Sequence, residues 1–571
     1  MRSTKASAVV ALVCLLLAAC APAAAPAGDR PSPPPQRQSA SPARTLVIAS
    51  RGEPPSLAAK PLQSVGGALD TFVPLYNAVL DYMDANAQPQ PYLAEALPQL
   101  NAESWRVFPD GRMETTYRLR PNLAWHDGTA LSAEDFVFGY TVYATPELGA
   151  AASPPIAQMA EVIAPDARTV VIRWRELYAD AGVLQRGFQP LPRHILEGPY
   201  RQMDAATFSS HPFWAQEYVG LGPYRVERWE PGSAIEAVAF DQHALGRPKI
   251  DRVRVVFIAD ANATLASMLT GDVHYSADFA LFYEEGTVLE REWAARGGGG
   301  VVLYSPTLPR ITQIQFRPEL VSPRELLDVR VRRAIAHAID TPQLIEVMAG
   351  TRGLATPSIT SPLADYHPQV DRAVAKYPYD QRRARELLEG AGLQRRADGM
   401  YSMSSEIEVW HITGAANERE NAIIVESLRR AGIDATSHAY PSAQLRDTER
   451  RAKLPAFFTG GGSGGEANLM DYGSAVIPKP ENRWQGGNRG AWSSAEFDRA
   501  WELVQVSLDR NQRIEQIVQM ERILSEDVGA IMHYYSPTVN AHAGNLRGPT
   551  AKTTPEAGVG IRDVHTWEWT S

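Results

Sequence analysis

The second half of the chain alternates short apolar strands with longer amphipathic helices, and this alternation constrains the fold more than any other feature. Ile407–Ile412 is predicted to be a strand, Ala415–Ala431 a helix, and Ile433–Ala439 a second strand. Two further helices are predicted over Arg324–Ile339 and Pro378–Ala391. Strands that alternate with helices in this way indicate an α/β fold.

The first half also mixes strands and helices, and two proline-containing joins divide the chain. With 571 residues the chain is too long for one hydrophobic core. The first join is predicted near Ser305–Arg310, between strands at Val301–Tyr304 and Ile311–Phe316, and the second near Ser536-Pro537. Two joins indicate that the chain crosses twice between two lobes.

The N-terminus has the features of a cleaved secretory leader. Arg2 and Lys5 precede the apolar run Ala6–Ala18, which is too short to span a bilayer. The run ends in Leu17-Ala18-Ala19-Cys20, which resembles a bacterial lipobox, so residues 1–19 are predicted to be a signal peptide and Cys20 to be lipidated. The alternative is an ordinary secretory leader with a chance cysteine.

Residues 21–43 are rich in Ala, Pro and Ser without periodicity, which predicts a disordered tether. The net charge of −9 is not concentrated in any basic domain, so nucleic acid is an unexpected partner. The two cysteines of the chain, Cys14 and Cys20, both lie near the N-terminus. The body after Cys20 therefore contains no disulfide and no thiolate.

Enzyme motifs are weak. Gly461–Gly465 fits the pattern G-x-S-x-G with Ser463 as a possible nucleophile, but a glycine tract matches this pattern easily. The sequence contains no phosphate-binding loop G-x-x-x-x-G-K-[ST] and no H-E-x-x-H zinc motif. We therefore expect no catalytic residue, metal or cofactor, and the chain is predicted not to be an enzyme.

The stretch Tyr117–Tyr140 combines a strand, a turn and a helix. Asp127-Gly128 predicts a tight turn, and Ser132 with Asp135 predicts a capping box that begins the helix. His126-Asp127 could suggest a catalytic dyad, but it is more simply interpreted as part of the turn.

Six segments in order resemble signature elements of the solute-binding protein family 5 of ABC importers. They are Pro91–Glu95, Asp110–Arg120, Trp125–Asp135, Gly222–Gly232, Asp328–Asp340 and Ala384–Gly392. The resemblance runs over most of the chain after the tether.

This resemblance implies a two-lobed fold of the type II periplasmic-binding-protein kind, in its large variant with an extra subdomain in lobe I. Residues 44–305 and 536–571 would form lobe I and residues 306–535 lobe II, joined by a hinge of two crossovers. The lobes would enclose a peptide or similar small solute and deliver it to a membrane permease. The protein would be a monomer on the extracytoplasmic face of a bacterial membrane, held by lipid on Cys20.

Family members that bind peptides resemble one another in using an aspartate after a second-lobe strand to hold the peptide ammonium. Glycines occupy that loop here, so Glu466 or Asp471 is expected to substitute. Arg310 is expected to meet a ligand carboxylate, and Trp410 and Trp484 to contribute aromatic surface.

Several alternatives stay open at the level of sequence. The cargo could instead be an oligosaccharide, an opine-like compound or a metal chelate. The chain could be a surface serine hydrolase that uses Ser463, or a receptor that hands its solute to a sensor.

Overall fold

The computed structural model places Arg44–Ser571 in one compact unit. It describes residues 44–60, 62, 69–151, 154–441, 444–445, 447–462, 464–555 and 560–570. The predicted signal peptide, Cys20, the tether and Ser463 lie outside the described residues.

The helices confirm the α/β character that the sequence predicts, with some changes at their ends. Arg324–Ile339 is a 3₁₀ turn followed by a helix that begins at Val329, because the Asp328 side chain accepts a hydrogen bond from Arg330 N and caps it. The α-helices are α1 (Leu69–Tyr76), α2 (Ala133–Tyr143), α3 (Arg193–Gln202), α4 (Ala205–Ser209), α5 (Ala261–Thr270), α6 (Tyr283–Ala295), α7 (Val329–Ala338), α8 (Thr341–Ala349), α9 (His367–Ala373), α10 (Gln381–Gly390), α11 (Ala415–Arg430), α12 (Thr448–Ala452), α13 (Ala495–Val506) and α14 (Arg510–Glu526).

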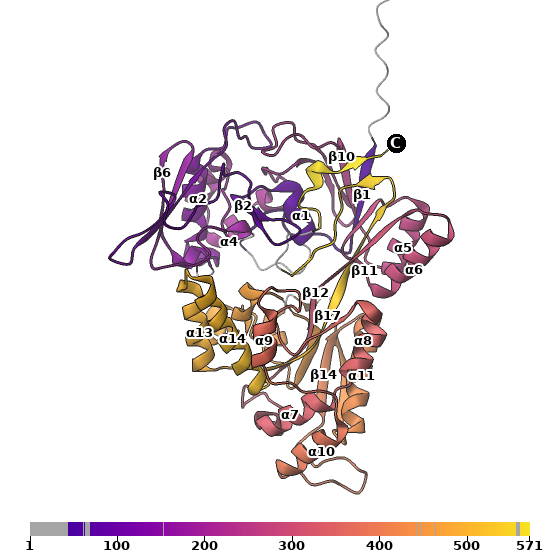
Figure 1. The fold of residues 1–571 in the computed structure, drawn as a ribbon. Coiled ribbons are helices and arrows are strands. Elements are labelled where there is room, and N and C mark those ends of the chain that lie inside the picture. The colour runs from indigo at the N-terminus through magenta and orange to yellow at the C-terminus, as the bar shows by residue number, and fades with distance from the viewer. Residues whose placement is uncertain are drawn as a thin grey trace, which may run out of the picture. The chain divides into compact units, whose positions relative to one another are not determined.

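Within the described residues, one sheet of eleven strands runs through the whole unit (Figure 1). Its order is β15 (Ala435–Tyr440), β14 (Ile407–Ile412), β16 (Phe457–Gly461), β12 (Gly300–Ile314), β17 (Ala530–Ala543), β11 (Tyr275–Leu281), β1 (Thr45–Ser50), β10 (Arg252–Phe257), β9 (Ala234–Ala239) and β8 (Tyr224–Glu230), with β13 (Leu354–Ala355) beside β17. A second sheet has the order β4 (Trp105–Val107), β5 (Met113–Arg118), β7 (Thr169–Trp174) and β6 (Met159–Asp166). Two short pairs join β2 (Asp81–Met83) to β3 (Pro89–Pro91), and β18 (Leu546–Arg547) to β19 (Glu568–Trp569).

The two predicted joins are parts of long strands and not loops. β12 runs unbroken through Ser305–Arg310, and β17 runs through Ser536-Pro537, the two pairing antiparallel side by side (Figure 1). The register shifts between Ser305 and Leu308, where two residues of β12 oppose the single residue Pro537. The prolines that suggested a chain break therefore mark a β-bulge, which bends a strand without ending it.

Hydrophobic side chains form separate clusters on the two sides of this crossing. Two clusters draw on residues 46–293 and 539–567, which we call body A. Two others draw on residues 311–534, which we call body B. Each body therefore has its own core, and β12 and β17 belong to both.

The stretch Tyr117–Tyr140 is part of the core of body A. Tyr117 and Trp125 are almost fully buried, and the Asp135 carboxylate accepts a hydrogen bond from Ser132 N at 2.9 Å. The Ser132 hydroxyl lies 3.5 Å from the same carboxylate and makes no cap bond of its own. Ser132 and Asp135 nevertheless stand in the reciprocal arrangement of the predicted capping box, which is confirmed.

Candidate functional site

The candidate site lies in body B, at the edge where three parallel strands end. β14 pairs in parallel with both β15 and β16, so the carboxyl ends Ile412, Tyr440 and Gly461 face the same edge of the sheet. In open α/β sheets, ligands bind outside the carboxyl ends of the strands. The register pairs Gly461 with Arg310, so this edge adjoins the crossing between the bodies.

Arg310 lies at this edge, but its guanidinium faces the interior of body B. It bonds Glu420 of α11 through both Nε, at 3.0 Å, and Nη2, and Nη2 also donates to Asn417 Oδ1 at 3.1 Å. The side chains of Arg310 and Glu420 are 12% and 1% exposed. Tyr534 donates its hydroxyl proton to Glu420 at 3.0 Å, which completes a buried network.

Electrostatics keep both members of this pair charged. Burial, the largest single cause, would lower the pKa of Arg310, but the charges and hydrogen bonds of Glu420 and Tyr534 together outweigh it and raise the pKa above its ordinary value. Burial likewise opposes ionisation of Glu420, yet Arg310 holds the pKa of Glu420 below its usual value. The contact of Arg310 with a ligand carboxylate stays a prediction. In this structure the guanidinium of Arg310 binds the carboxylate of Glu420.

His533 interacts electrostatically with Glu420 and Arg310 of this network. Its Nε2 lies 2.8 Å from Thr312 Oγ1, and it is 1% exposed. Burial lowers the pKa of His533 to about 4, so the ring is neutral at physiological pH.

Glu466, the proposed substitute for the ammonium anchor, is also paired. Its carboxylate accepts a hydrogen bond from Arg513 Nε of α14. The same guanidinium donates to both oxygens of Asp180 in body A, at 2.7 and 3.2 Å. Burial, as the main cause, raises the pKa of Glu466 above its ordinary value.

The remaining predicted contacts are not gathered at one point. The Trp410 ring of β14 stacks on His438 with centroids 4.9 Å apart, and its Nε1 donates to Glu408 at 2.8 Å. Lys453 Nζ lies over the Trp484 ring, 4.7 Å from the ring centroid. Since Lys453 precedes β16, Trp484 lies toward the amino end of that strand, away from the candidate edge.

Asp471 also lies away from the edge. It is the last residue but one of the 3₁₀ segment Glu466–Tyr472 and closely approaches Gly487, where an added Cβ would lie 2.2 Å from Asp471 Oδ1. The carbonyl of Gly487 accepts from Gln313 Nε2 at 3.4 Å, on the part of β12 beyond Arg310. The structure therefore places Arg310 at the strand-end edge and does not bring all five predicted residues together.

His126 and Asp127 lie far in sequence from this edge and have structural partners. His126 Nδ1 accepts from Gly220 N at 3.2 Å, and Nε2 donates to Gly222 O at 3.0 Å. Burial lowers the pKa of His126 to about 4. Gly222 also packs against the backbone of Tyr76, where a Cβ would lie 2.3 Å from the carbonyl carbon.

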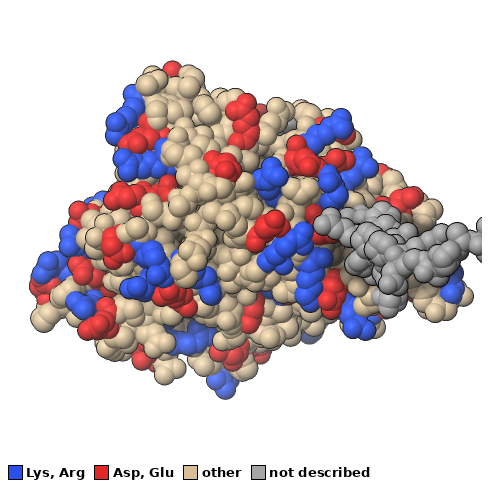
Figure 2. Space-filling model, turned by 90° about the horizontal axis from the view of Figure 1, so that it is seen from above, with Lys and Arg blue, Asp and Glu red and all other residues tan. Residues whose placement is uncertain are grey.

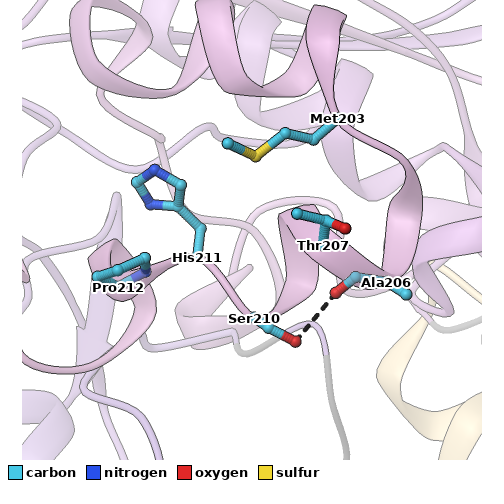
Figure 3. Close-up of a pocket in the computed structure, with 6 residues that line it drawn as sticks. All are labelled: Met203, Ala206, Thr207, Ser210, His211 and Pro212. Carbon is cyan, nitrogen blue, oxygen red and sulfur yellow. Dashed lines mark hydrogen bonds between the residues drawn. The ribbon is translucent and has the colours of Figure 1, made fainter.

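One hollow on the surface of the described residues does not coincide with the candidate edge. It is an open groove of about 460 Å³ beside α4 in body A (Figure 3), lined by Met203, Ala206, Thr207, Ser210, His211 and Pro212. The Ser210 hydroxyl donates a hydrogen bond to the Ala206 carbonyl at 3.0 Å. We place the candidate site at the strand ends and not in this groove, because the groove offers few convergent polar groups.

Surface charge and metal ligands add no second candidate. Acidic and basic side chains are interspersed over the face in Figure 2. In the described ranges, no group of three or more His, Cys, Asp or Glu side chains could hold a metal ion. No helix among the described residues is both long and apolar enough to cross a membrane.

Sequence reasoning missed Glu420, Arg513 and Asp180. Glu420 shares a helical face with Ile424 and Leu428, and a carboxylate on an apolar face indicates a buried cationic partner. Nothing in the surrounding sequence marks Asp180, which lies in a loop after β7.

The comparisons place this chain in a family. A family model described as "Bacterial extracellular solute-binding proteins, family 5 Middle" matches residues 96–473. ABC transporter peptide-binding relatives in Brucella, such as that of Brucella ovis, are 27% identical over 296 residues, which is 51% of each chain. The match thus spans about half the length of these curated relatives.

Two proteins of solved structure extend the likeness. The oligopeptide-binding protein AppA of Bacillus subtilis is 22% identical over 518 residues, 88% of each chain. Its complex with a nonapeptide matches with a TM-score of 0.76 at 20% identity, over 92% of this chain and 99% of that one. NikZ of Campylobacter jejuni, solved with Ni(L-His), matches with a TM-score of 0.76 at 19% identity over the same shares.

The chain therefore belongs to the bacterial extracellular solute-binding proteins of family 5. Its fold is the two-lobed α/β fold of type II periplasmic solute-binding proteins.

Proposed function

We propose that this protein is the binding component of an ABC importer. It encloses a peptide or a similar small solute between two lobes and delivers it to a membrane permease whose ATPase is a separate chain. Body A and body B support the predicted lobe limits, residues 44–305 with 536–571 and residues 306–535.

One observation carries this proposal. Two separately packed bodies are joined by the paired strands β12 and β17, and the carboxyl edge of β14, β15 and β16 adjoins that crossing. A ligand at this edge would meet both bodies, and a ligand that contacts both bodies favours the closed arrangement over the open one.

Peptide is the first choice of cargo because the relatives in Brucella and Bacillus subtilis carry names for peptide or oligopeptide binding. The test is native mass spectrometry of freshly purified protein, followed by tryptophan fluorescence titration with an equimolar mixture of random pentapeptides. The chain contains 12 tryptophans, so closure is expected to change the emission. An unchanged spectrum and no retained peptide mass would overturn the peptide assignment.

A metal chelate is the second candidate, supported by the likeness to NikZ with its Ni(L-His) ligand. The same fluorescence titration with Ni²⁺ and histidine separates the two candidates. A response that requires metal and amino acid together would favour the chelate. The oligosaccharide and opine alternatives have no specific support in the geometry.

The lipid anchor is a separate part of the proposal. Cleavage before Cys20 and lipidation of its thiol would hold a monomer on the extracytoplasmic face of the membrane. Intact-mass measurement of the membrane fraction is expected to show the mass of the chain from Cys20 plus lipid. The Cys20→Ala variant is expected to lose both the added mass and the membrane association.

The serine hydrolase alternative has little support, and Ser463 lies outside the described residues. Ester turnover that disappears in the Ser463→Ala variant would revive it. Absence of turnover in the wild-type protein would leave the receptor proposal intact.

A further inference from the structure

Arg513 connects the two bodies. Its guanidinium donates from Nη1 and Nη2 to the two oxygens of Asp180 in body A. The remaining donor, Nε, points to Glu466 in body B. One side chain therefore holds a carboxylate of each body at the same time.

The two carboxylates differ in how they are tied to Arg513. Glu466 lies in the same 3₁₀ segment as the buried Leu469, and Arg513 lies in α14 next to Ile514. Leu469, Ile514 and Ile517 belong to one hydrophobic cluster of body B. Glu466 and Arg513 thus move as one piece. Asp180 belongs to the other body and is the partner that would be lost if the bodies separated.

Burial and charge suit this arrangement. The side chains of Arg513 and Glu466 are 12% and 16% exposed, whereas Asp180 is 43% exposed. Burial would lower the pKa of Arg513, but Asp180 and Glu466 together raise it above its usual value. A guanidinium already fixed by Glu466 loses little rotational freedom when it meets Asp180.

Further contacts join the two bodies close to Asp180 and Arg513. Ala179 N donates to Gln505 O at 2.7 Å, and Gln158 Nε2 donates to Gln505 Oε1 at 3.1 Å. Leu508, in the connection from α13 to α14, packs against the hydrophobic core of body A. The Asp180 loop therefore docks on body B through a charged fork, a backbone hydrogen bond and an apolar contact.

Other pairs between the bodies are more exposed. Glu284 of α6 meets Arg419 of α11 at 2.8 Å, with 62% and 44% of the two side chains exposed. Glu290 and Arg352 are 3.4 Å apart and are exposed to a similar extent. Exposed pairs of this kind contribute little, typically less than a factor of about 5 in an equilibrium constant.

We propose that Arg513, held in place by Glu466, is a latch for Asp180 that stabilises the closed form, so that Asp180 sets ligand affinity without touching the ligand. This inference rests on the proposed function, because it assigns the contact to the closed state of a binding protein. Its expected signature is a change in the dissociation rate of the ligand.

Hydrogen exchange of the full-length protein without added ligand tests the latch directly. The amide of Ala179 reports closure, since it donates to Gln505 across the two bodies. In the Asp180→Asn variant the segment 177–181 is expected to exchange about 5- to 10-fold faster, while exchange in β12 and β17 stays unchanged and the free energy of unfolding falls by less than about 1 kcal/mol. Asp180→Glu, which keeps the carboxylate, is expected to restore exchange to within about twofold of the wild type.

Glu284→Gln is the matched control, because it removes a more exposed pair between the same two bodies. Its effect on segment 177–181 is expected to stay below about twofold. Equal exchange in the wild type and Asp180→Asn, or an equal effect of Glu284→Gln, would overturn the latch.

A ligand measurement completes the test with the random pentapeptide mixture as the probe. Asp180→Asn is expected to release bound peptide about 5- to 10-fold faster than the wild type, with little change in the association rate. If the wild type binds no peptide while the exchange difference is present, the peptide assignment fails and the latch stands. If peptide binds and leaves both proteins at the same rate, the latch is wrong and the peptide assignment stands.

Discussion

Arg310 and Arg513 form similar ion pairs in very different settings. Both are 12% exposed and both bond a glutamate of body B. The partners of Arg310, which are Glu420 and Asn417, all belong to body B, whereas Arg513 also reaches Asp180 in body A. The comparison teaches that the same side-chain chemistry can stabilise one body or the arrangement of two, depending on where its second partner lies.

The largest effect is expected from removing the guanidinium of Arg310. Arg310→Met leaves Glu420 charged and almost fully buried without a cation, so the free energy of unfolding is expected to fall by about 3–5 kcal/mol. Urea unfolding followed by circular dichroism measures this change. Arg382→Met, at a site where 83% of the side chain is exposed, is the control and is expected to change stability by less than about 0.5 kcal/mol.

A change of pH is expected to act differently on the two arginine pairs, because the buried His533 interacts electrostatically with Glu420 and Arg310. The folded pKa of His533 is about 4, against an ordinary value of 6.5. Between these values the unfolded chain binds more protons than the folded chain, so stability falls as pH falls from 6.5 to 4. His533 alone is expected to contribute about 3 kcal/mol to this loss.

Urea unfolding at pH 7, 6, 5 and 4.5 checks the acid dependence. His533→Gln is expected to flatten the dependence, and the partly exposed His211→Gln is the control. An unaltered pH slope in His533→Gln would show that another group is responsible; His126 and His243, whose pKa values burial also lowers to about 4, would be tested next.

The third test compares the two partners of Arg513. Arg513→Met leaves Glu466 largely buried without a cation and is expected to lower the free energy of unfolding by about 1–3 kcal/mol. Asp180→Asn is expected to lower it by less than about 1 kcal/mol, because Asp180 is nearly half exposed. Equal losses in the two variants would mean that Asp180 stabilises the fold and not the closed arrangement.

The smallest expected effect belongs to the exposed pair on α6. Glu284→Gln is expected to change the free energy of unfolding by less than about 0.5 kcal/mol, and less still in 0.5 M salt, because exposed charges are screened. Thermal unfolding at low and high salt measures this. A larger effect would place a second latch between α6 and α11.

Much of the architecture could be predicted from local sequence patterns. The strand–helix–strand unit β14–α11–β15 is present within two residues of its predicted limits, because its periodicity and its terminal glycine are local signals. The region near Ser305 was harder. Proline suggested a break, but pairing of β12 with β17, a contact between residues more than 200 positions apart, keeps the strand continuous.

The candidate site was less predictable than the fold. Arg310 is at the crossing as expected, yet its orientation depends on Glu420, which lies 110 positions away. Trp484 is separated from the strand-end edge because it packs against Lys453. Side-chain partners of this kind are set by tertiary contacts, which neither spacing nor composition encodes.

The bulge in β12 has a kinetic consequence. Pro306 and Pro309 flank Leu308 and carry no amide proton, so this part of the strand has fewer backbone hydrogen bonds to distort when it bends. The activation barrier for moving one body against the other is then expected to be low. The time for which a solute stays bound would be governed by contacts such as that of Asp180 with Arg513, and the stiffness of the hinge would contribute little.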